Sequence, residues 1–121
     1  MSDTLDVEDE KLIVLARGAR ERAGSSSGAA VRDGDGRTYA GADVTTTTLS
    51  LSALQVAVAT ALSSGAESFE AAVVLGSGGD DPGRVTLAEF SPAATLLVAD
   101  VTGALLDRLP AAADQQEGES G

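Results

Sequence analysis

The side chains that could do chemistry in this chain of 121 residues are carboxylates and hydroxyls, because the sequence contains no histidine and no cysteine. Cysteine and histidine are the usual zinc ligands, and histidine is the usual base that activates a nucleophilic serine. Ser52 therefore lacks a partner for nucleophilic catalysis. We expect Ser50 or Ser52 to cap the start of a helix instead.

Two glycine-rich segments place aspartates close together. The run Asp33-Gly34-Asp35-Gly36 has the aspartate spacing of a calcium loop but no glutamate at the closing ligand position, and Asp-Gly pairs favour a tight hairpin turn. The segment 76–83 lacks the lysine of a phosphate-binding loop, and Asp80 and Asp81 would repel phosphate. We expect Arg84, just after it, to be a solvated surface residue.

The positions of apolar residues predict the elements that carry these side chains. Helical spacing predicts an amphipathic helix over 7–23, and two strands, at 28–32 and 37–44, flank the aspartate-rich turn as a β-hairpin. After a polar connector at 45–48, residues 50–64 are apolar on nearly every side, as in a buried central helix. The remaining predicted elements are a strand at 70–76, a helix at 85–90 and strands at 95–100 and 104–109. This order predicts a mixed sheet covered by helices.

Several local strings in this order resemble one known family. They are Gly28-Ala29-Ala30-Val31 with residues 35–41, the segment that begins Ser52-Ala53-Leu54-Gln55 and ends at Gly65, and Arg84 with residues 87–90. They are similar to the opening hairpin, the catalytic helix and the following helix of cytidine deaminases. The resemblance covers roughly residues 8–109 and implies an α/β fold, a three-layer α/β/α sandwich with a mixed sheet.

The resemblance also shows where the chain departs from that family. Cytidine deaminases use a zinc ion to activate water and a glutamate to carry protons. The resemblance puts Ser52 at the first zinc-ligand position, Leu54 at the glutamate position and residues 79–83 at the remaining ligands. Asp80 and Asp81 offer oxygens, but a third and a fourth ligand are absent. We therefore predict no catalytic residues, no metal site, no cofactor and no deaminase activity.

A vestigial pocket could still bind a ligand. The family's nucleoside-contact motif falls at residues 43–45, where Asp43 can still form a hydrogen bond, and Ser50 and Ser52 are candidate donors at the start of the helix. Asp43, Ser50 and Ser52 are therefore the candidate ligand-binding residues. Three functions stay open, in this order: a non-catalytic interaction or regulatory module, a nucleoside- or small-ligand-binding protein, and an active cytidine deaminase with an unrecognised site.

Charge restricts the partners. The formal net charge is −11, which disfavours binding to nucleic acid and to anionic membrane surfaces. No apolar run has spanning length and no signal sequence opens the chain, so we expect a cytoplasmic protein. Residues 1–6 and 110–121 are predicted to be flexible ends around a domain at 7–109. The resemblance implies a homo-oligomer, because members of the family build their sites where subunits meet.

Overall fold

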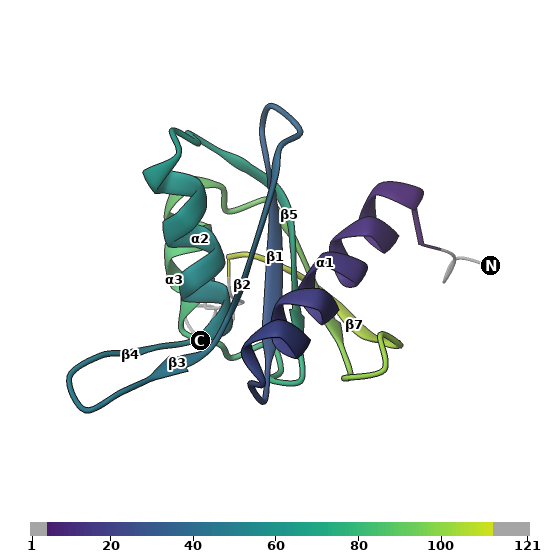
Figure 1. Ribbon diagram of the computed structural model, residues 1–121. Helices are drawn as coiled ribbons and strands as arrows, with labels where there is room; N and C mark the ends of the chain where they lie inside the picture. Colours follow the sequence, from purple (N-terminus) through teal and green to yellow (C-terminus); the bar gives the residue numbers. More distant parts are fainter. Residues whose placement is uncertain (1–4, 113–121) are drawn as a thin grey trace, which may run out of the picture.

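The strand β5 (Phe69–Leu75) is apolar on both faces, and this requires a covering layer on each side of its sheet. Ala72 and Val74 point into one core cluster, and Val73 and Leu75 into the other. In the computed structural model, which describes residues 5–112, helix α1 covers the second cluster while α2 and α3 cover the first (Figure 1). The three-layer α/β/α arrangement predicted from the sequence is confirmed.

The main sheet is mixed and has the strand order β2-β1-β5-β6-β7. Its other strands are β1 (Gly28–Asp33), β2 (Thr38–Ala42), β6 (Thr95–Ala99) and β7 (Leu105–Pro110), and the helices are α1 (Val7–Ala23), α2 (Ala53–Ser63) and α3 (Gly83–Phe90). All neighbours are antiparallel except β5 and β6. A parallel pair needs a crossover, and α3 supplies it. The loop after β5 therefore leads directly into the N-terminus of α3.

Helix α2 lies very close to the sheet at Gly41 in β2. A methyl group placed on Gly41 would lie 2.6 Å from Val56 Cγ1 and 2.9 Å from the backbone nitrogen of Ala57. Such distances are well inside van der Waals contact, so only glycine permits this packing. The close contact fixes the height of α2 above the sheet and, with it, the position of the helix N-terminus.

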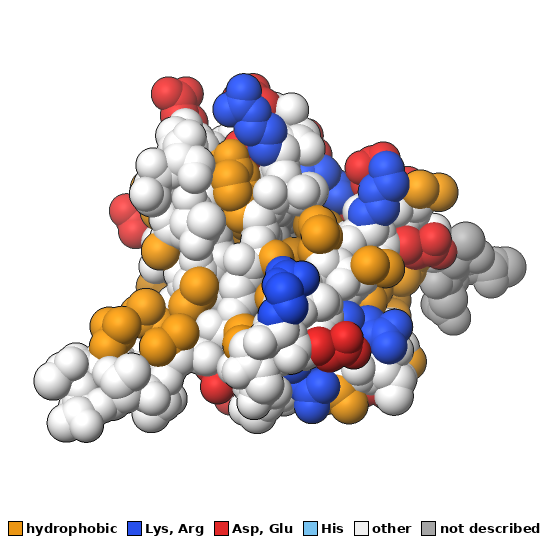
Figure 2. All heavy atoms as spheres, viewed as in Figure 1, with side chains coloured by type: hydrophobic (Ala, Val, Ile, Leu, Met, Phe, Trp, Pro, Cys, Tyr) orange, Lys and Arg blue, Asp and Glu red, His pale blue; other side chains and the backbone are white. Residues whose placement is uncertain are grey.

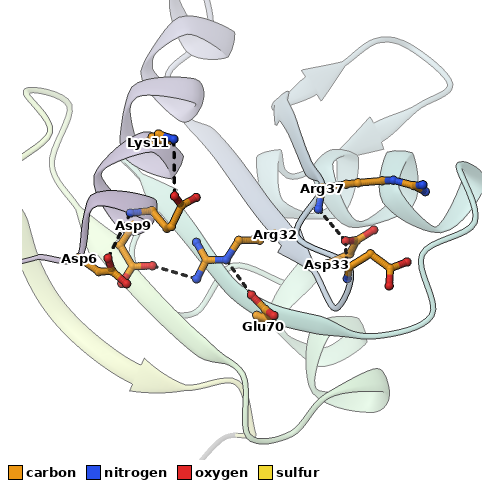
Figure 3. Close-up of polar contacts among 9 residues, drawn as sticks. Asp6, Asp9, Lys11, Arg32, Asp33, Arg37 and Glu70 are labelled. Atoms are coloured by element: carbon orange, nitrogen blue, oxygen red, sulfur yellow. Dashed lines mark hydrogen bonds and ion pairs between the residues drawn. The ribbon is translucent and has the colours of Figure 1, made fainter.

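On the opposite face, Arg32 of β1 joins three elements (Figure 3). Its Nη2 donates to Asp9 Oδ1 of α1 at 3.2 Å, and its Nε donates to Glu70 Oε1 of β5 at 2.9 Å. The Arg32 side chain is only 13% exposed, so the two carboxylates balance a largely buried charge. This network holds α1 on the sheet.

The aspartate-rich turn between β1 and β2 is a hairpin turn, as predicted. Asp33 is 1% exposed, and its Oδ1 accepts hydrogen bonds from the backbone N–H groups of Asp35 and Arg37. Its carboxylate is therefore directed into its own turn, which leaves the calcium-loop alternative without its first ligand.

Several boundaries differ from the prediction, and the helix predicted over 85–90 begins two residues earlier, at Gly83. The helix predicted over 50–64 begins at Ala53. The connector predicted at 45–48 includes the last residue of β3 (Val44–Thr45) and most of the turn that joins β3 to β4 (Ser50–Leu51) in a small hairpin. Pro110 belongs to β7 and Ala111 is buried, so the fold extends past the boundary predicted at 109. The rest of the predicted flexible tail lies outside the described residues. Within residues 5–112, no helix has the length and apolar character needed to cross a membrane.

The close contact at Gly41 can be tested with a matched pair of glycine substitutions. We expect Gly41→Ala to lower the free energy of unfolding by roughly 1–3 kcal/mol, because the added methyl overpacks the interface with α2. Gly18→Ala is the control, since Gly18 lies in α1 with only the flexible side chain of Arg22 near it, and alanine there should stabilise by about 0.5–1 kcal/mol. Urea denaturation measures both. Equal effects of the two substitutions would contradict the packing described here.

Candidate functional site

The three candidate ligand-binding residues lie around the base of the β3–β4 hairpin, but their side chains serve different contacts. Val44 pairs with Leu51 and Thr45 with Ser50, so Asp43 and Ser52 flank the hairpin on its two strands. Ser50 is exposed on the hairpin itself. Asp43 bonds to Ser27, whereas Ser52 bonds to Gln55 and Asp81. The structure thus brings the residues near one another in the fold without directing them at one space.

Ser52 begins α2 through a reciprocal capping box. Its Oγ accepts from the backbone N–H of Gln55 at 3.1 Å, and the Gln55 side chain accepts from the backbone N–H of Ser52 at 2.9 Å. Two of the N–H groups that a helix leaves free at its start are satisfied in this way. The capping role predicted for Ser50 or Ser52 therefore belongs to Ser52.

Asp81, in the loop between β5 and α3, connects the N-termini of α2 and α3. Its Oδ1 accepts from Ser52 Oγ at 2.5 Å and from the backbone N–H of Gly83 at 2.8 Å, while its Oδ2 accepts from the backbone N–H of Leu54 at 3.3 Å. Asp81 is 5% exposed. A carboxylate is favoured here because the N-termini of helices carry partial positive charge and free N–H donors.

The two helix ends are also in direct contact. A methyl group on Gly83 would lie 2.6 Å from the nitrogen of Gln55 and 2.8 Å from Leu54 Cβ. Leu54 itself is fully buried in the core cluster under α2 and α3. The space between the helix ends is therefore filled by backbone, the Asp81 carboxylate and an apolar side chain.

Asp43 links the end of β2 to the segment before β1. Its Oδ1 accepts from both the backbone N–H and the hydroxyl of Ser27, each at 2.9 Å. Partial burial by itself raises the pKa of Asp43, but the hydrogen bonds from Ser27 outweigh it and hold the pKa below its ordinary value of 3.8. The charged carboxylate of Asp43 thus joins the end of β2 to the segment before β1 through hydrogen bonds.

Arg84 is not the solvated residue that we expected from the sequence. Its guanidinium donates to the carbonyl oxygens of Gly79, Pro110 and Ala111, at 2.8–3.1 Å. It therefore ties the end of β7 to the loop that carries Asp81. A cavity of about 870 Å³ lies beside it on the outer side of α3, lined mainly by apolar atoms, and its charged lining residues are Asp80, Asp81, Arg84 and Glu89.

Sequence reasoning considered Asp81 as an oxygen ligand for a metal and as a residue that repels phosphate, and it gave Ser27 no role in the site. The sequence did contain one signal for Asp81, since an aspartate just before Pro82-Gly83 is typical of a helix start. Its contacts across 27 and 29 residues of chain have no local signal. Among residues 5–112, no group of three or more histidine, cysteine, aspartate or glutamate side chains is placed to hold a metal ion.

Comparisons with known proteins agree with this fold. The family model described as "Cytidine deaminase-like" matches residues 5–103. The crystal structure of cytidine deaminase from Burkholderia pseudomallei is similar with a TM-score of 0.73 and 24% identity, over 84% of this chain and 91% of that one. No curated protein matches the chain.

Two mycobacterial structures are similar as well. Cytidine deaminase from Mycobacterium tuberculosis has a TM-score of 0.64 and 27% identity, over 77% of this chain and 85% of that one. Cytidine deaminase from Mycobacterium leprae has a TM-score of 0.67 and 21% identity, over 88% of this chain and 96% of that one.

Substitution of Asp81 tests the bridge between the helix ends. We expect Asp81→Ala to lower the free energy of unfolding by roughly 2–4 kcal/mol, because buried donors lose a charged acceptor. Asp81→Asn should cost less, because its amide oxygen can still accept hydrogen bonds. Asp80→Ala is the matched control, since Asp80 is exposed, and should change stability by about 0.5 kcal/mol or less. Equal losses for Asp80→Ala and Asp81→Ala in urea denaturation would contradict the bridge.

The lowered pKa of Asp43 predicts a pH dependence. A carboxylate with a depressed pKa stabilises the fold above its unfolded-state pKa, and this stabilisation disappears as the pH falls through the folded-state pKa. The stability difference between wild type and Asp43→Asn should therefore be constant from pH 5 to 7. It should shrink when the pH falls below 3.8, the ordinary pKa of the aspartate side chain. Unfolding measured across this range checks it. In a Ser27→Ala background, the stability difference between the protein with Asp43 and its Asp43→Asn variant should be smaller, because one hydrogen bond to the carboxylate is lost. A stability difference that grows towards acid pH would contradict the role given to Asp43.

Proposed function

The chain belongs to the cytidine deaminase-like family, and from the chemistry of its helix ends we propose that it is a zinc-free, non-catalytic member that acts as an interaction or regulatory module. The observation that carries this proposal is the Asp81 carboxylate, which accepts hydrogen bonds from both helix N-termini. The resemblance to cytidine deaminases puts the zinc ligands at these same two helix starts. A hydrogen-bonded bridge stands where the family's chemistry needs a metal.

The donor set at this place does not fit a zinc centre. It consists of a serine hydroxyl and one buried carboxylate, in a chain without cysteine or histidine. Zinc in proteins takes three or four ligands from sulfur, imidazole and carboxylate groups. The side-chain oxygens of Ser52 and Asp81 already take part in hydrogen bonds with protein partners. We therefore derive no reaction step through a metal.

The proton-carrying group of the family reaction also has no counterpart. The resemblance puts its glutamate at Leu54, an apolar residue that cannot transfer a proton and is fully buried. Loss of the metal ligands and loss of the proton carrier support the same conclusion independently.

Binding of a nucleoside without catalysis is the second function considered, and the geometry supports it less. The carboxylate of Asp43 and the hydroxyl of Ser52 would each have to break internal hydrogen bonds before meeting a ligand. Breaking bonds to a charged group costs about 1.5–3 kcal/mol each, which reduces affinity by the same amount. An interaction module needs none of these rearrangements, and a homo-oligomer is the association that the family resemblance implies.

The proposal is tested by an assay of deamination on protein purified without chelators and supplied with zinc. Ultraviolet absorbance with cytidine and deoxycytidine should show no turnover, and elemental analysis should find no stoichiometric zinc. A zinc-containing cytidine deaminase assayed in parallel serves as the positive control. Turnover together with about one zinc per chain would overturn the proposal.

A variant pair tests the role of Leu54. Leu54→Glu restores the carboxylate of the family but buries it in the core, so we expect no gain of turnover and a loss of about 3 kcal/mol or more in the free energy of unfolding. Leu54→Met conserves volume and should cost less than about 1.5 kcal/mol. Deaminase activity in Leu54→Glu would show that the site can be rebuilt by one residue and would contradict the proposal.

A further inference from the structure

The cavity beside α3 has the size of a binding site for a small organic molecule. Its volume is about 870 Å³, and such sites are commonly about 300–1,000 Å³. Its walls come from three segments: the loop before α3, the outer side of α3, which lies behind α2 in Figure 1, and the residues that follow β7. Arg84 donates hydrogen bonds to the carbonyl oxygens of Gly79 and Ala111, and so joins two of these walls. The cavity is therefore held in shape by the fold before any ligand binds.

Apolar side chains supply most of the lining. They are Pro82, Val85, Ala88, Pro92, Ala111 and Ala112. Val85 is 75% exposed, more than any other large apolar residue within residues 5–112. This side chain adds little to the core, and a ligand that covers it is favoured because apolar surface is removed from water. The lining thus suits the apolar body of an organic ligand.

Two carboxylates at the cavity lack a cationic partner within residues 5–112. Four lining residues are charged, but the Asp81 carboxylate is bonded at the helix junction and the Arg84 guanidinium is bonded to three carbonyl groups. Asp80 and Glu89 are exposed and take part in none of the ion pairs of the described residues. On the face seen in Figure 2, by contrast, acidic side chains lie among lysine and arginine side chains. Asp80 and Glu89 are therefore free to meet a charge on a ligand.

The charge of the lining selects the ligand. Three carboxylates and one guanidinium give the lining a net charge of −2, in a chain whose formal net charge is −11. Anions such as phosphate esters are repelled, and so are residues 113–121, which contain Asp114, Glu117 and Glu119 but no lysine or arginine. A metal ion is also disfavoured, because within residues 5–112 no three side chains of the metal-binding types are grouped to hold one. An organic cation satisfies both the apolar lining and the carboxylates.

We propose that the cavity binds a small organic cation, in which an amidinium, guanidinium or ammonium group is attached to an apolar body. The cationic group lies against Asp80 and Glu89, where it forms charge-assisted hydrogen bonds, and the apolar body covers Val85. Binding leaves the hydrogen bonds of the helix junction intact, so the site is additional to the interaction module proposed above.

The proposal is tested by NMR titration of the isotope-labelled full chain with benzamidine, which carries an amidinium group on an apolar ring. Benzamide, which has the same ring and nearly the same shape but no charge, is the matched control ligand. We expect saturable shifts of the backbone signals of cavity residues such as Val85, Ala88 and Ala112. Benzamidine should bind about fivefold more tightly than benzamide, because exposed ion pairs of this kind contribute a factor of up to about five each. Added salt should reduce this ratio of affinities.

Two double variants locate the charges that act on the ligand. Asp80→Asn combined with Glu89→Gln should bring the ratio of the two affinities close to one. Glu10→Gln combined with Asp35→Asn removes the same charge from exposed positions outside the cavity and should leave the ratio unchanged. Val85→Ser should weaken the binding of both ligands by about threefold, since it removes apolar surface and no charge.

Three outcomes would overturn the proposal: no saturable shift at the cavity residues up to about 10 mM benzamidine, equal affinities for the two ligands, or an equal change of the ratio in the two double variants. Cooperative unfolding in urea verifies that every variant is folded. Deaminase turnover and zinc content bear on the proposed function alone, so failure of one proposal is distinguishable from failure of the other.

Discussion

The carboxylate of Asp81 lies where the N-termini of α2 and α3 meet, and the geometry around it depends on this one group. Both helices present unsatisfied N–H groups and partial positive charge at this point, which would repel one another without an anion between them. Asp81 accepts from Leu54 at one helix and from Gly83 at the other, and Ser52 adds its hydroxyl. Asp81 thereby stabilises the contact between α2 and the start of the crossover helix α3, in a small fold with few aromatic residues.

Three other contacts hold the elements around this junction of helix ends in place. Gly41 lets α2 approach β2 closely, and Gly83 lets α3 approach α2, so the first core cluster closes around Leu54. Arg84 holds the loop that carries Asp81 to the end of β7 through three carbonyl groups. These contacts pack the junction of the two helix ends tightly.

The sequence predicted the architecture well because the signals for it are local. Apolar periodicity and capping residues located the helices, and the Asp-Gly turn located the first hairpin. Asp81 and Ser52 are 29 residues apart, and Asp43 and Ser27 are 16 apart, so no local pattern could reveal that each pair is bonded. The β3–β4 hairpin was not predicted because its strands have two residues each, too few to show an alternating apolar pattern. The prediction that Arg84 is a solvated surface residue was wrong because its partners are backbone carbonyl groups, which every residue has and which no sequence pattern reveals.

We propose that a carboxylate bridge, rather than a metal, joins the two helix ends. The most direct test is the unfolding midpoint of the full chain measured with added zinc and again with a strong chelator. A ligand that binds the folded state raises its stability by RT ln(1 + [L]/Kd), so a specific zinc site would shift the midpoint upward as zinc increases. This account predicts the same midpoint in both conditions. A zinc-dependent rise that the chelator reverses would contradict it.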